Sequence, residues 1–200
     1  MGLFLSRNLA NLLISFYWKK GKLAGAQIEE MVSLVSRTGR HLQRYDKGCR
    51  QVVGCIPYRY RKSNASEGKA TWRELEVLLI SSQKGVAMMF PKGGWETDES
   101  MEEAALRETM EEAGVKGDVQ KSLGHWRYKS KSQGTYHDGY MFPLLVNEQL
   151  EIWPEKNVRQ RRWVSASEAK DICQHGWMKE ALEVLLSRAM QDVAKTSIRA

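Results

Sequence analysis

The chain has 200 residues, of which 42% are apolar and 28% are charged, a composition that suits one folded domain with residues left over at its ends. No stretch approaches the roughly 20 apolar residues that a membrane-spanning helix needs, so we expect no stable membrane insertion. Three cysteines without a C-x-x-C pair exclude a disulfide framework or a zinc knuckle, and we expect them to pack as apolar side chains in a reducing compartment.

The net charge of +7 is unevenly distributed along the chain. Residues 93–115 carry eight acidic side chains against one base, Arg107, so this segment has a charge of −7 and the rest of the chain has +14. An acidic patch in a basic chain is what a cation site facing an anionic substrate requires, although a solvated acidic helix has the same pattern. Because no recognition motif with interleaved aromatic residues is present, we expect no nucleic-acid partner.

The amino-terminal 28 residues contain no acid. They combine apolar residues and serines with four bases, which are Arg7, Lys19, Lys20 and Lys22. This composition is typical of a mitochondrial transit peptide. The apolar run at 9–18 could also be the core of a secretory signal, but it lacks a strongly basic segment before it and a small-residue cleavage site after it. A transit peptide and a loosely docked extension remain equally compatible with residues 1–36. From the transit-peptide interpretation we expect a mitochondrial location, and from the alternative a cytoplasmic one.

A folded domain is predicted over residues 37–190, followed by a short tail at 191–200. Strands are predicted where short apolar or β-branched runs are bounded by polar residues, glycine or proline, namely at about 51–60, 75–81, 86–90, 119–128, 139–146 and 161–164. Helices are predicted between Ser100 and Gly114, at 167–173 and at 178–190. Strands first, a helix in mid-chain and helices last indicate a layered α+β domain with a mixed sheet.

The mid-chain helix has the clearest signals. Ser100 and Glu103 form the S-x-x-E capping box that begins a helix, and Gly114 is placed to end it. Three glutamates, Glu108, Glu111 and Glu112, follow at positions i, i+3 and i+4, so their side chains share one face. Carboxylates this close repel one another unless a cation lies between them, and Mg²⁺ or Mn²⁺ is the natural candidate because hard cations prefer oxygen ligands. An exposed acidic face is the simpler alternative.

A longer pattern decides between these two interpretations. Gly93, five residues, Glu99, seven residues and then R-E-T-M-E-E-A-G-V at 107–115 resemble the Nudix box, G-x5-E-x7-R-E-U-x-E-E-x-G-U, where U is a bulky aliphatic residue. Thr109 is the one departure, and it puts local core packing in doubt more than catalysis. Gly93 and Gly114 are the turn residues of this box.

The resemblance extends over about residues 37–188. Its closest form is the diphosphoinositol polyphosphate phosphohydrolase group, including plant-type members that also hydrolyse diadenosine polyphosphates. The segments that carry this likeness are Ser81–Ser82, F-P-K-G-G-W-E at 90–96, E-E-A-G-V-K-G at 111–117 and R-Q-R-R-W at 159–163.

The resemblance implies a Nudix fold, in which a mixed sheet lies between helices (α/β/α), and a helical glutamate triad that holds Mg²⁺ (or Mn²⁺). Carried onto this chain, Glu108 and Glu112 are the firmest metal ligands, and Glu111 is the base or a further ligand. Glu99 is a supporting carboxylate, and Arg107 is placed to anchor a neighbouring carboxylate or loop.

Basic residues outside the box are candidates for holding the substrate. Arg159 stands where the resembling group has a substrate-binding arginine, although Arg159, Arg161 and Arg162 could also solvate the edge of a strand. Four further bases lie in segments that line the group's pocket, namely Arg44, Arg50, Lys84 and Lys92. Four aromatic residues either stack on a nucleobase or pack in the core, namely Trp126, Tyr128, Tyr136 and Trp153.

Three functions are compared on these residues. The first is metal-dependent cleavage of a diphosphate bond in a small polyanion, a diphosphoinositol polyphosphate or a diadenosine polyphosphate. The second is hydrolysis of nucleotides such as ADP-ribose, NADH or nucleoside triphosphates. The family's NADH and coenzyme A signatures are missing, as is the proline that ADP-ribose enzymes tend to carry about fifteen residues past the box. The third is a binding protein that has lost its chemistry, which the three intact glutamates disfavour.

Overall fold

The computed structural model describes residues 36–61, 75–83, 85, 87–130 and 134–198. The expected extension, apart from Ser36, and the candidate substrate residue Lys84 lie outside the described residues. None of the helices that the structure describes is long and apolar enough to cross a bilayer.

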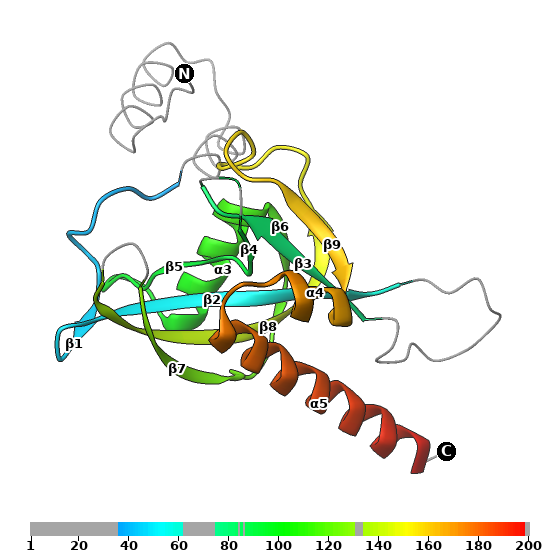
Figure 1. Ribbon diagram of the computed structural model, residues 1–200. Coiled ribbons are helices and arrows are strands. Elements are labelled where there is room, and N and C mark those ends of the chain that lie inside the picture. The colour runs from blue at the N-terminus through cyan, green and yellow to red at the C-terminus, as the bar shows by residue number, and fades with distance from the viewer. Residues whose placement is uncertain (1–35, 62–74, 84, 86, 131–133, 199–200) are drawn as a thin grey trace.

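A mixed β-sheet forms the centre of the domain (Figure 1). Its longest strands are β2 (Cys49–Tyr60) and β8 (Tyr136–Gln149), which pair in parallel. β2 also pairs antiparallel with β3 (Leu75–Ser81), so the sheet combines both kinds of pairing. The path runs β4-β3-β2-β8-β6, with β4 at Met88–Met89 and β6 at Val115–Val119.

Four further strands pair beside this path. They are β1 (Tyr45–Asp46) and β5 (Lys92–Gly94) on β2, β7 (Gly124–Lys129) on β8, and β9 (Arg161–Ser165) on β3.

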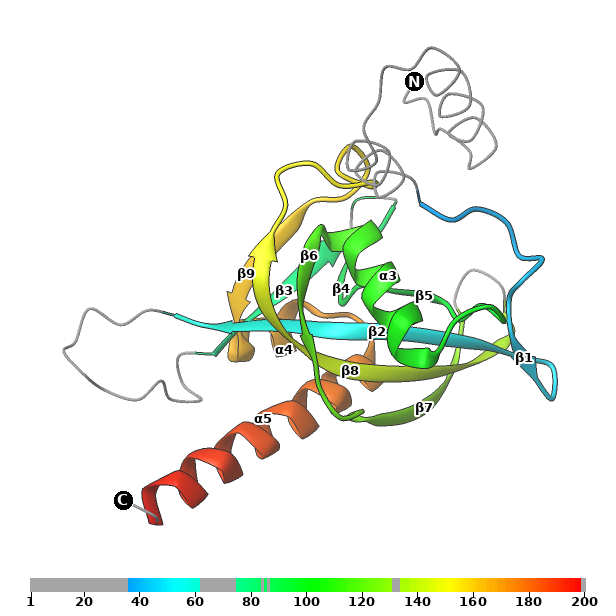
Figure 2. The same cartoon turned by 180° about the vertical axis from the view of Figure 1, so that it is seen from behind.

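Helices cover both faces of the sheet. Helix α3 (Met101–Ala113) lies on one face, and α4 (Ala166–Ile172) and α5 (Gly176–Ile198) lie on the other (Figures 1 and 2). Alternate residues of β3 face opposite sides of the sheet. Val77 and Leu79 pack with α4 and α5, whereas Leu78 and Ile80 pack with α3. This alternation follows from the period of two along a strand. The expected α/β/α arrangement is confirmed.

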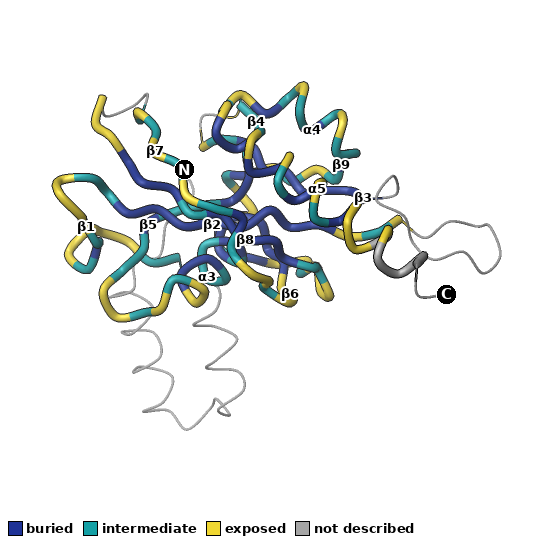
Figure 3. The backbone as a smooth tube through the Cα atoms, turned by 90° about the horizontal axis from the view of Figure 1, so that it is seen from below, coloured by how far each residue is buried: buried dark blue, intermediate teal, exposed yellow. Residues whose placement is uncertain are grey.

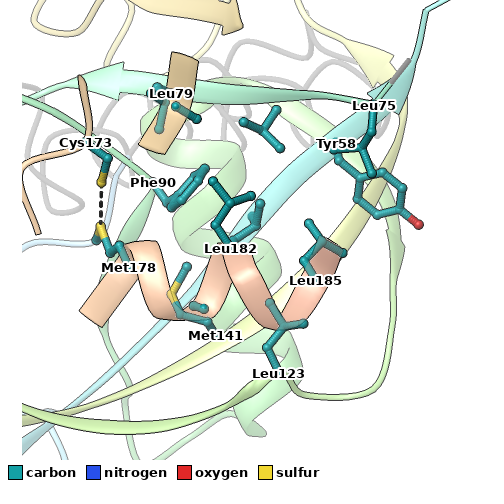
Figure 4. Close-up of a cluster of buried hydrophobic side chains, with 14 of the residues drawn as sticks. Tyr58, Leu75, Leu79, Phe90, Leu123, Met141, Cys173, Met178, Leu182 and Leu185 are labelled. Carbon is teal, nitrogen blue, oxygen red and sulfur yellow. Dashed lines mark hydrogen bonds between the residues drawn. The ribbon is translucent and has the colours of Figure 1, made fainter. Parts of the chain in front are cut away.

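The two apolar layers fix the sheet from both sides. In the layer between the sheet and α5, Leu182 of the helix packs in one cluster with Phe90 and Met141 (Figure 4). The buried segments concentrate along the central strands (Figure 3). Cys55 and Cys173 are free and lie in the two buried apolar clusters, in agreement with their expected packing role, whereas Cys49 is free and half-buried.

Several predicted boundaries differ from the structure. The single strand expected at 119–128 is wrong: β6 and β7 are separate, and the break at 120–123 lies opposite Pro143, which has no N–H to donate to a neighbouring strand. The short strands β1 and β5 were not predicted. Helix α5 continues eight residues beyond the expected end at residue 190, so most of the segment expected to be a tail is helical.

Helix α3 begins and ends as the sequence predicts. The Ser100 hydroxyl accepts a hydrogen bond from the Glu103 amide at 3.2 Å, and the Glu103 carboxylate accepts one from the Ser100 amide at 2.8 Å. Thr109, the departure from the box, is fully buried, and its hydroxyl donates to the Ala105 carbonyl at 2.7 Å. The hydroxyl is therefore satisfied within the helix, and core packing is preserved.

The end of α3 is held by Trp153, which lies between β8 and β9, and by Arg161 of β9. Gly114 has a φ of 62°, in the left-handed region that favours glycine. A Cβ on Gly114 would lie 2.6 Å from Cγ of Trp153. The Arg161 guanidinium lies over the Trp153 ring, 4.0 Å from its centroid, and donates to the Ala113 and Gly114 carbonyls at 3.1 Å. Arg161 thus caps the helix, and it does not merely solvate the strand edge.

We predict that Gly114→Ala destabilises the protein more than Gly48→Ala does. Both glycines have positive φ (62° and 80°), but a Cβ on Gly48 meets nothing within 4 Å. Gly48→Ala should cost about 1 kcal/mol from backbone strain alone, and Gly114→Ala at least about twice that because Trp153 must move. Urea unfolding of the two variants measures the difference, and equal losses would show that Trp153 does not hold the helix end.

Candidate active site

The three glutamates of the box lie on the face of α3 that meets strand β5. A Cβ on Gly93 would lie 2.0 Å from Cδ of Glu108, so only glycine lets this carboxylate approach the strand. Gly93 is therefore needed for its lack of a side chain, and the spacing between Gly93 and Glu108 in the box has a direct physical cause.

Glu112 is buried and contacts two neighbouring elements. One of its carboxylate oxygens accepts a hydrogen bond from the Lys92 amide at 2.7 Å, and the other pairs with the Arg159 guanidinium. Arg159 is only 7% exposed; it also donates to Glu155 at 2.5 Å and to the Ser81 carbonyl at 2.9 Å. Two of the four segments that carry the family likeness, Ser81–Ser82 and 159–163, thus meet at Arg159, which pairs with this carboxylate.

Arg107 holds several acceptors at once. It donates two hydrogen bonds to the Glu99 carboxylate, at 2.8 and 2.7 Å, and one to the Gly94 carbonyl at 2.9 Å. It also pairs with Glu108 at 2.9 Å and lies 3.6 Å from Glu111. Glu99 in turn accepts from the Glu96 amide at 3.1 Å. Arg107 and Glu99 therefore fix the loop before α3 against the helix.

Glu111 has a partner that no sequence pattern indicates. The backbone amide of Arg37 donates to both of its carboxylate oxygens, at 3.3 and 3.2 Å. A backbone donor leaves no signature in residue type, so only the folded chain reveals this contact. Glu155, beside Arg159, was also missed because it lies outside every recognisable motif.

Burial dominates the electrostatics of the triad. Desolvation and, to a lesser extent, the nearby Glu108 carboxylate raise the pKa of Glu111 to about 7, against the opposing effect of Arg107. Desolvation likewise raises the pKa of Glu108 and of Glu112, against the opposing effects of Arg107 and Arg159. Three carboxylates that resist ionisation in one place form a site whose ionised state a cation would stabilise.

The chemistry of these donors fits a divalent cation held by few protein ligands. Within the part of the chain that the structure describes, no three His, Cys, Asp or Glu side chains converge closely enough to enclose a metal ion, because Arg107 and Arg159 draw Glu108 and Glu112 to themselves. A closed cage is not required, since Mg²⁺ commonly takes one or two carboxylates and completes its shell with water and phosphate oxygens. The residues present therefore fit Mg²⁺ or Mn²⁺.

A cleft of about 430 Å³ adjoins the carboxylates. Its lining includes Arg50, Lys92 and Arg159, as expected, together with three basic or titratable residues that were not, namely Lys129, His137 and His175. The last three come from strands and a loop far from the box in sequence, so only the topology of the sheet brings them here. Lys92, Gly93 and Arg159 belong to both the cleft and the carboxylate site.

Arg44 does not reach this cleft. It donates to the Glu96 and Thr97 carbonyls, both at 2.9 Å, and lies over the Trp95 ring. It lines a second, more open hollow with Trp95 and Tyr140. The structure thus places the Arg44 side chain beside the loop of the box and outside the cleft that Arg50, Lys92 and Arg159 line.

Three of the four aromatic residues that were candidates for stacking on a nucleobase pack against other residues of the protein. Tyr128 lines the cleft, but its ring stacks on Trp177 with centroids 4.6 Å apart. Trp126 lies against Trp177 and donates to Glu180 at 3.0 Å. Trp153 covers Gly114, and Tyr136 is exposed. No nucleobase platform is evident among the described residues of the cleft.

The fold matches that of solved hydrolases. It resembles a NUDIX hydrolase from Nitrosomonas europaea with a TM-score of 0.54 and 16% identity, covering 70% of this chain and 89% of that one. It resembles a C. elegans Ap4A hydrolase in a binary complex with a TM-score of 0.51 and 19% identity, covering 68% and 95%. The α/β/α sandwich with a glutamate-bearing helix is thus the Nudix hydrolase fold.

Sequence comparison identifies the family to which the chain belongs. The NUDIX domain model matches residues 67–185. Nudix hydrolase 17, mitochondrial, of Arabidopsis thaliana is 63% identical over 161 residues, which are 80% of this chain and 87% of the relative. Nudix hydrolase 21, chloroplastic, of the same plant is 55% identical over 202 residues, covering 96% and 98%. A mouse diphosphoinositol polyphosphate phosphohydrolase 3-alpha is 39% identical over 105 residues, covering 51% and 62%. The chain belongs to the Nudix hydrolase family and is a phosphoanhydride hydrolase.

The raised pKa of Glu111 predicts how stability depends on pH without metal. Its pKa is about 7 in the folded protein against an ordinary 4.5, so between these values the folded state binds more protons than the unfolded state does. The free energy of unfolding should therefore fall as pH rises from 5 to 8, by up to about 3 kcal/mol.

Urea unfolding in EDTA measures this dependence, with Glu111→Gln as the comparison because it has no proton to lose. The variant should show a flatter pH dependence than the wild type. Added Mg²⁺ should restore wild-type stability mainly above pH 7, where the carboxylates are ionised. Parallel pH profiles for the two proteins would contradict the assignment.

Proposed function

We propose that this enzyme uses Mg²⁺ to cleave a diphosphate bond in polyanionic substrates, namely diphosphoinositol polyphosphates, diadenosine polyphosphates or both. One observation carries the proposal: the cationic cleft and the carboxylate site share Lys92, Gly93 and Arg159. Phosphates held in the cleft would therefore lie directly beside the cation site.

The electrostatics of the cleft favour substrates with many phosphates. Burial lowers the pKa of Arg50, with the nearby Arg40 adding to the effect, and burial lowers the pKa of Lys92, with Arg159 adding. The pKa of His137 is lowered by burial and by Arg50. Cationic groups that are desolvated and repel one another are stabilised by a bound polyanion. Each additional phosphate can pair with one more of these cationic groups.

The shortage of aromatic surface argues against tight recognition of a nucleobase. Among the described residues of the cleft, Tyr128 is the one tyrosine, phenylalanine or tryptophan, and its ring is stacked on Trp177. Two relatives are named for polyphosphate substrates, the mouse diphosphoinositol polyphosphate phosphohydrolase and the C. elegans Ap4A hydrolase. Both names agree with recognition through phosphates.

The proposed mechanism gives each carboxylate one task. Glu108 and Glu112 would hold Mg²⁺, or Mn²⁺ in its place. Bound there, the cation would neutralise charge on the phosphate oxygens and make a nearby water more acidic. Glu111 would accept a proton from the water that attacks phosphorus, as the bridging P–O bond breaks and the second phosphate leaves. Lys92 and Arg159 would hold phosphate oxygens in line.

Arg107 and Glu99 have a supporting role in this proposal. Their mutual hydrogen bonds and the Arg107 contact with Gly94 fix the strand and loop that face the triad. Neither residue needs to touch the substrate. In this proposal they are therefore positioning residues.

We predict that Glu108→Gln, Glu111→Gln and Glu112→Gln each lower kcat at least about 10²-fold while the protein stays folded, because each change removes a charge from the metal site or from the base. Glu102→Gln is the matched control, since Glu102 is exposed on the first turn of the same helix. Steady-state kinetics at saturating Mg²⁺ measure the losses. Wild-type turnover in all three variants would rule out the mechanism.

A panel of substrates tests the proposed specificity. We expect kcat/KM to be higher for a diphosphoinositol polyphosphate or diadenosine hexaphosphate than for ADP-ribose, NADH or dGTP, and to fall steeply with added salt as several cationic contacts are screened. Lys129→Ala should raise KM for the hexaphosphate about 2- to 5-fold, as expected for one exposed contact of roughly 0.5–1 kcal/mol. Lys116→Ala, away from the cleft, is the control. ADP-ribose or NADH as the best substrate, with little effect of salt, would favour the alternative nucleotide hydrolase.

We also propose that residues 1–36 direct the protein to mitochondria. The acid-free, basic composition supports this, as does the name of Nudix hydrolase 17, mitochondrial, while Nudix hydrolase 21 is named chloroplastic. A fluorescent protein fused after residues 1–35 should enter mitochondria. A diffuse cytosolic signal would contradict the proposal, and a chloroplast signal would assign the leader to the other organelle.

A further inference from the structure

The segment before β1 lies along the loop that leads into α3. Thr97 donates its amide to the Leu42 carbonyl at 2.8 Å, and Arg44 donates its amide to the Trp95 carbonyl at 2.9 Å. Gln43 and Glu96 form an antiparallel bridge between them. The chain that enters the domain is therefore fixed to the loop of the box by backbone hydrogen bonds.

Arg37, near the start of this segment, contacts the site with both its backbone and its side chain. Its amide donates to both oxygens of Glu111. Its guanidinium pairs with Glu96 at 2.5 Å and Asp98 at 2.9 Å, and it lies 3.9 Å from Glu99. The side chain thus holds the loop, and the backbone holds the carboxylate.

These two contacts act on the orientation of Glu111. Its side chain is only 6% exposed, and Arg107 lies 3.6 Å from the oxygen Oε1. An amide that donates to both oxygens restricts rotation of the carboxylate about its terminal bond, and hydrogen-bond partners of this kind orient groups in metal sites. Glu111 is therefore positioned by an element 74 residues away in sequence.

We propose that Arg37 is a positioning residue for Glu111: its amide orients the carboxylate and its guanidinium keeps the amide in place. This inference rests on the proposed function, in which Glu111 takes the proton from the attacking water. Arg37 contacts Glu111 directly and pairs with neither Glu108 nor Glu112 in the structure, so its loss slows the chemical step and leaves cation binding at Glu108 and Glu112 nearly unchanged.

Substitutions in the full chain separate the backbone contact from the side-chain contact. Arg37→Pro removes the N–H and the guanidinium, Arg37→Ala keeps the N–H, and Arg37→Lys keeps the N–H and a positive charge. Arg162→Ala is the control, because Arg162 pairs with Glu168 at the surface. The readouts are kcat and KM for diadenosine hexaphosphate at saturating Mg²⁺, the dissociation constant of Mn²⁺ without substrate, and the melting temperature.

We expect Arg37→Pro to lower kcat about 10- to 100-fold, with KM and the Mn²⁺ dissociation constant within about threefold of wild type. Arg37→Ala should lose less, and Arg37→Lys should recover most of the activity. Unchanged kcat in Arg37→Pro would overturn the inference, and so would a parallel loss of kcat, Mn²⁺ affinity and melting temperature, which indicates a purely structural role. Tighter Mn²⁺ binding would also overturn it, by showing that Arg37 competes with the cation.

Two glutamate variants distinguish failure of this inference from failure of the proposed function. If Glu108→Gln leaves Mn²⁺ binding unchanged, the proposed cation site is wrong whatever the Arg37 variants do. If Glu108→Gln weakens Mn²⁺ binding and Glu111→Gln abolishes turnover while Arg37→Pro retains it, the function stands and only the role of Arg37 is wrong.

Discussion

The cost of burying three carboxylates side by side governs this active site. Glu108, Glu111 and Glu112 all have raised pKa values because burial disfavours their charge, and such groups need partners of opposite charge or hydrogen-bond donors. Arg107, on the helix itself, pairs with Glu108, and Arg159, from the segment before β9, pairs with Glu112. The Arg37 amide, from the N-terminal segment, donates to Glu111. Two parts of the chain that are distant in sequence are thereby bound to one helix face.

Residues that take no part in the proposed chemistry give this site its shape. Gly93 leaves room for Glu108, and Gly114 and Arg161 end α3 directly after Glu112. Layers of apolar side chains on both faces of the sheet hold α3 and the C-terminal helices in fixed places. The cleft shares Lys92 and Arg159 with the carboxylates, so in the proposed function the substrate and the cation would bind side by side.

Local signals made part of this structure predictable. The caps of α3 and the apolar run at 75–81 depend on neighbours in sequence, so the helix and β3 were predicted with their correct bounds. The separation of β6 from β7 depends on Pro143 in a distant strand, and the Arg37 contact uses a backbone amide. His137 and His175 reach the cleft only through the sheet topology. Arg44 carries the right charge, but its hydrogen bonds turn it toward the loop of the box.

The central claim is that the buried glutamates form the cation site. A crystal structure with Mn²⁺, recorded at a wavelength where manganese scatters anomalously, tests it most directly. We predict an anomalous peak about 2.0–2.3 Å from carboxylate oxygens of Glu108 and Glu112, and loss of that peak in Glu108→Gln crystals. A peak elsewhere in the molecule, with Glu108 and Glu112 still paired to Arg107 and Arg159, would contradict it.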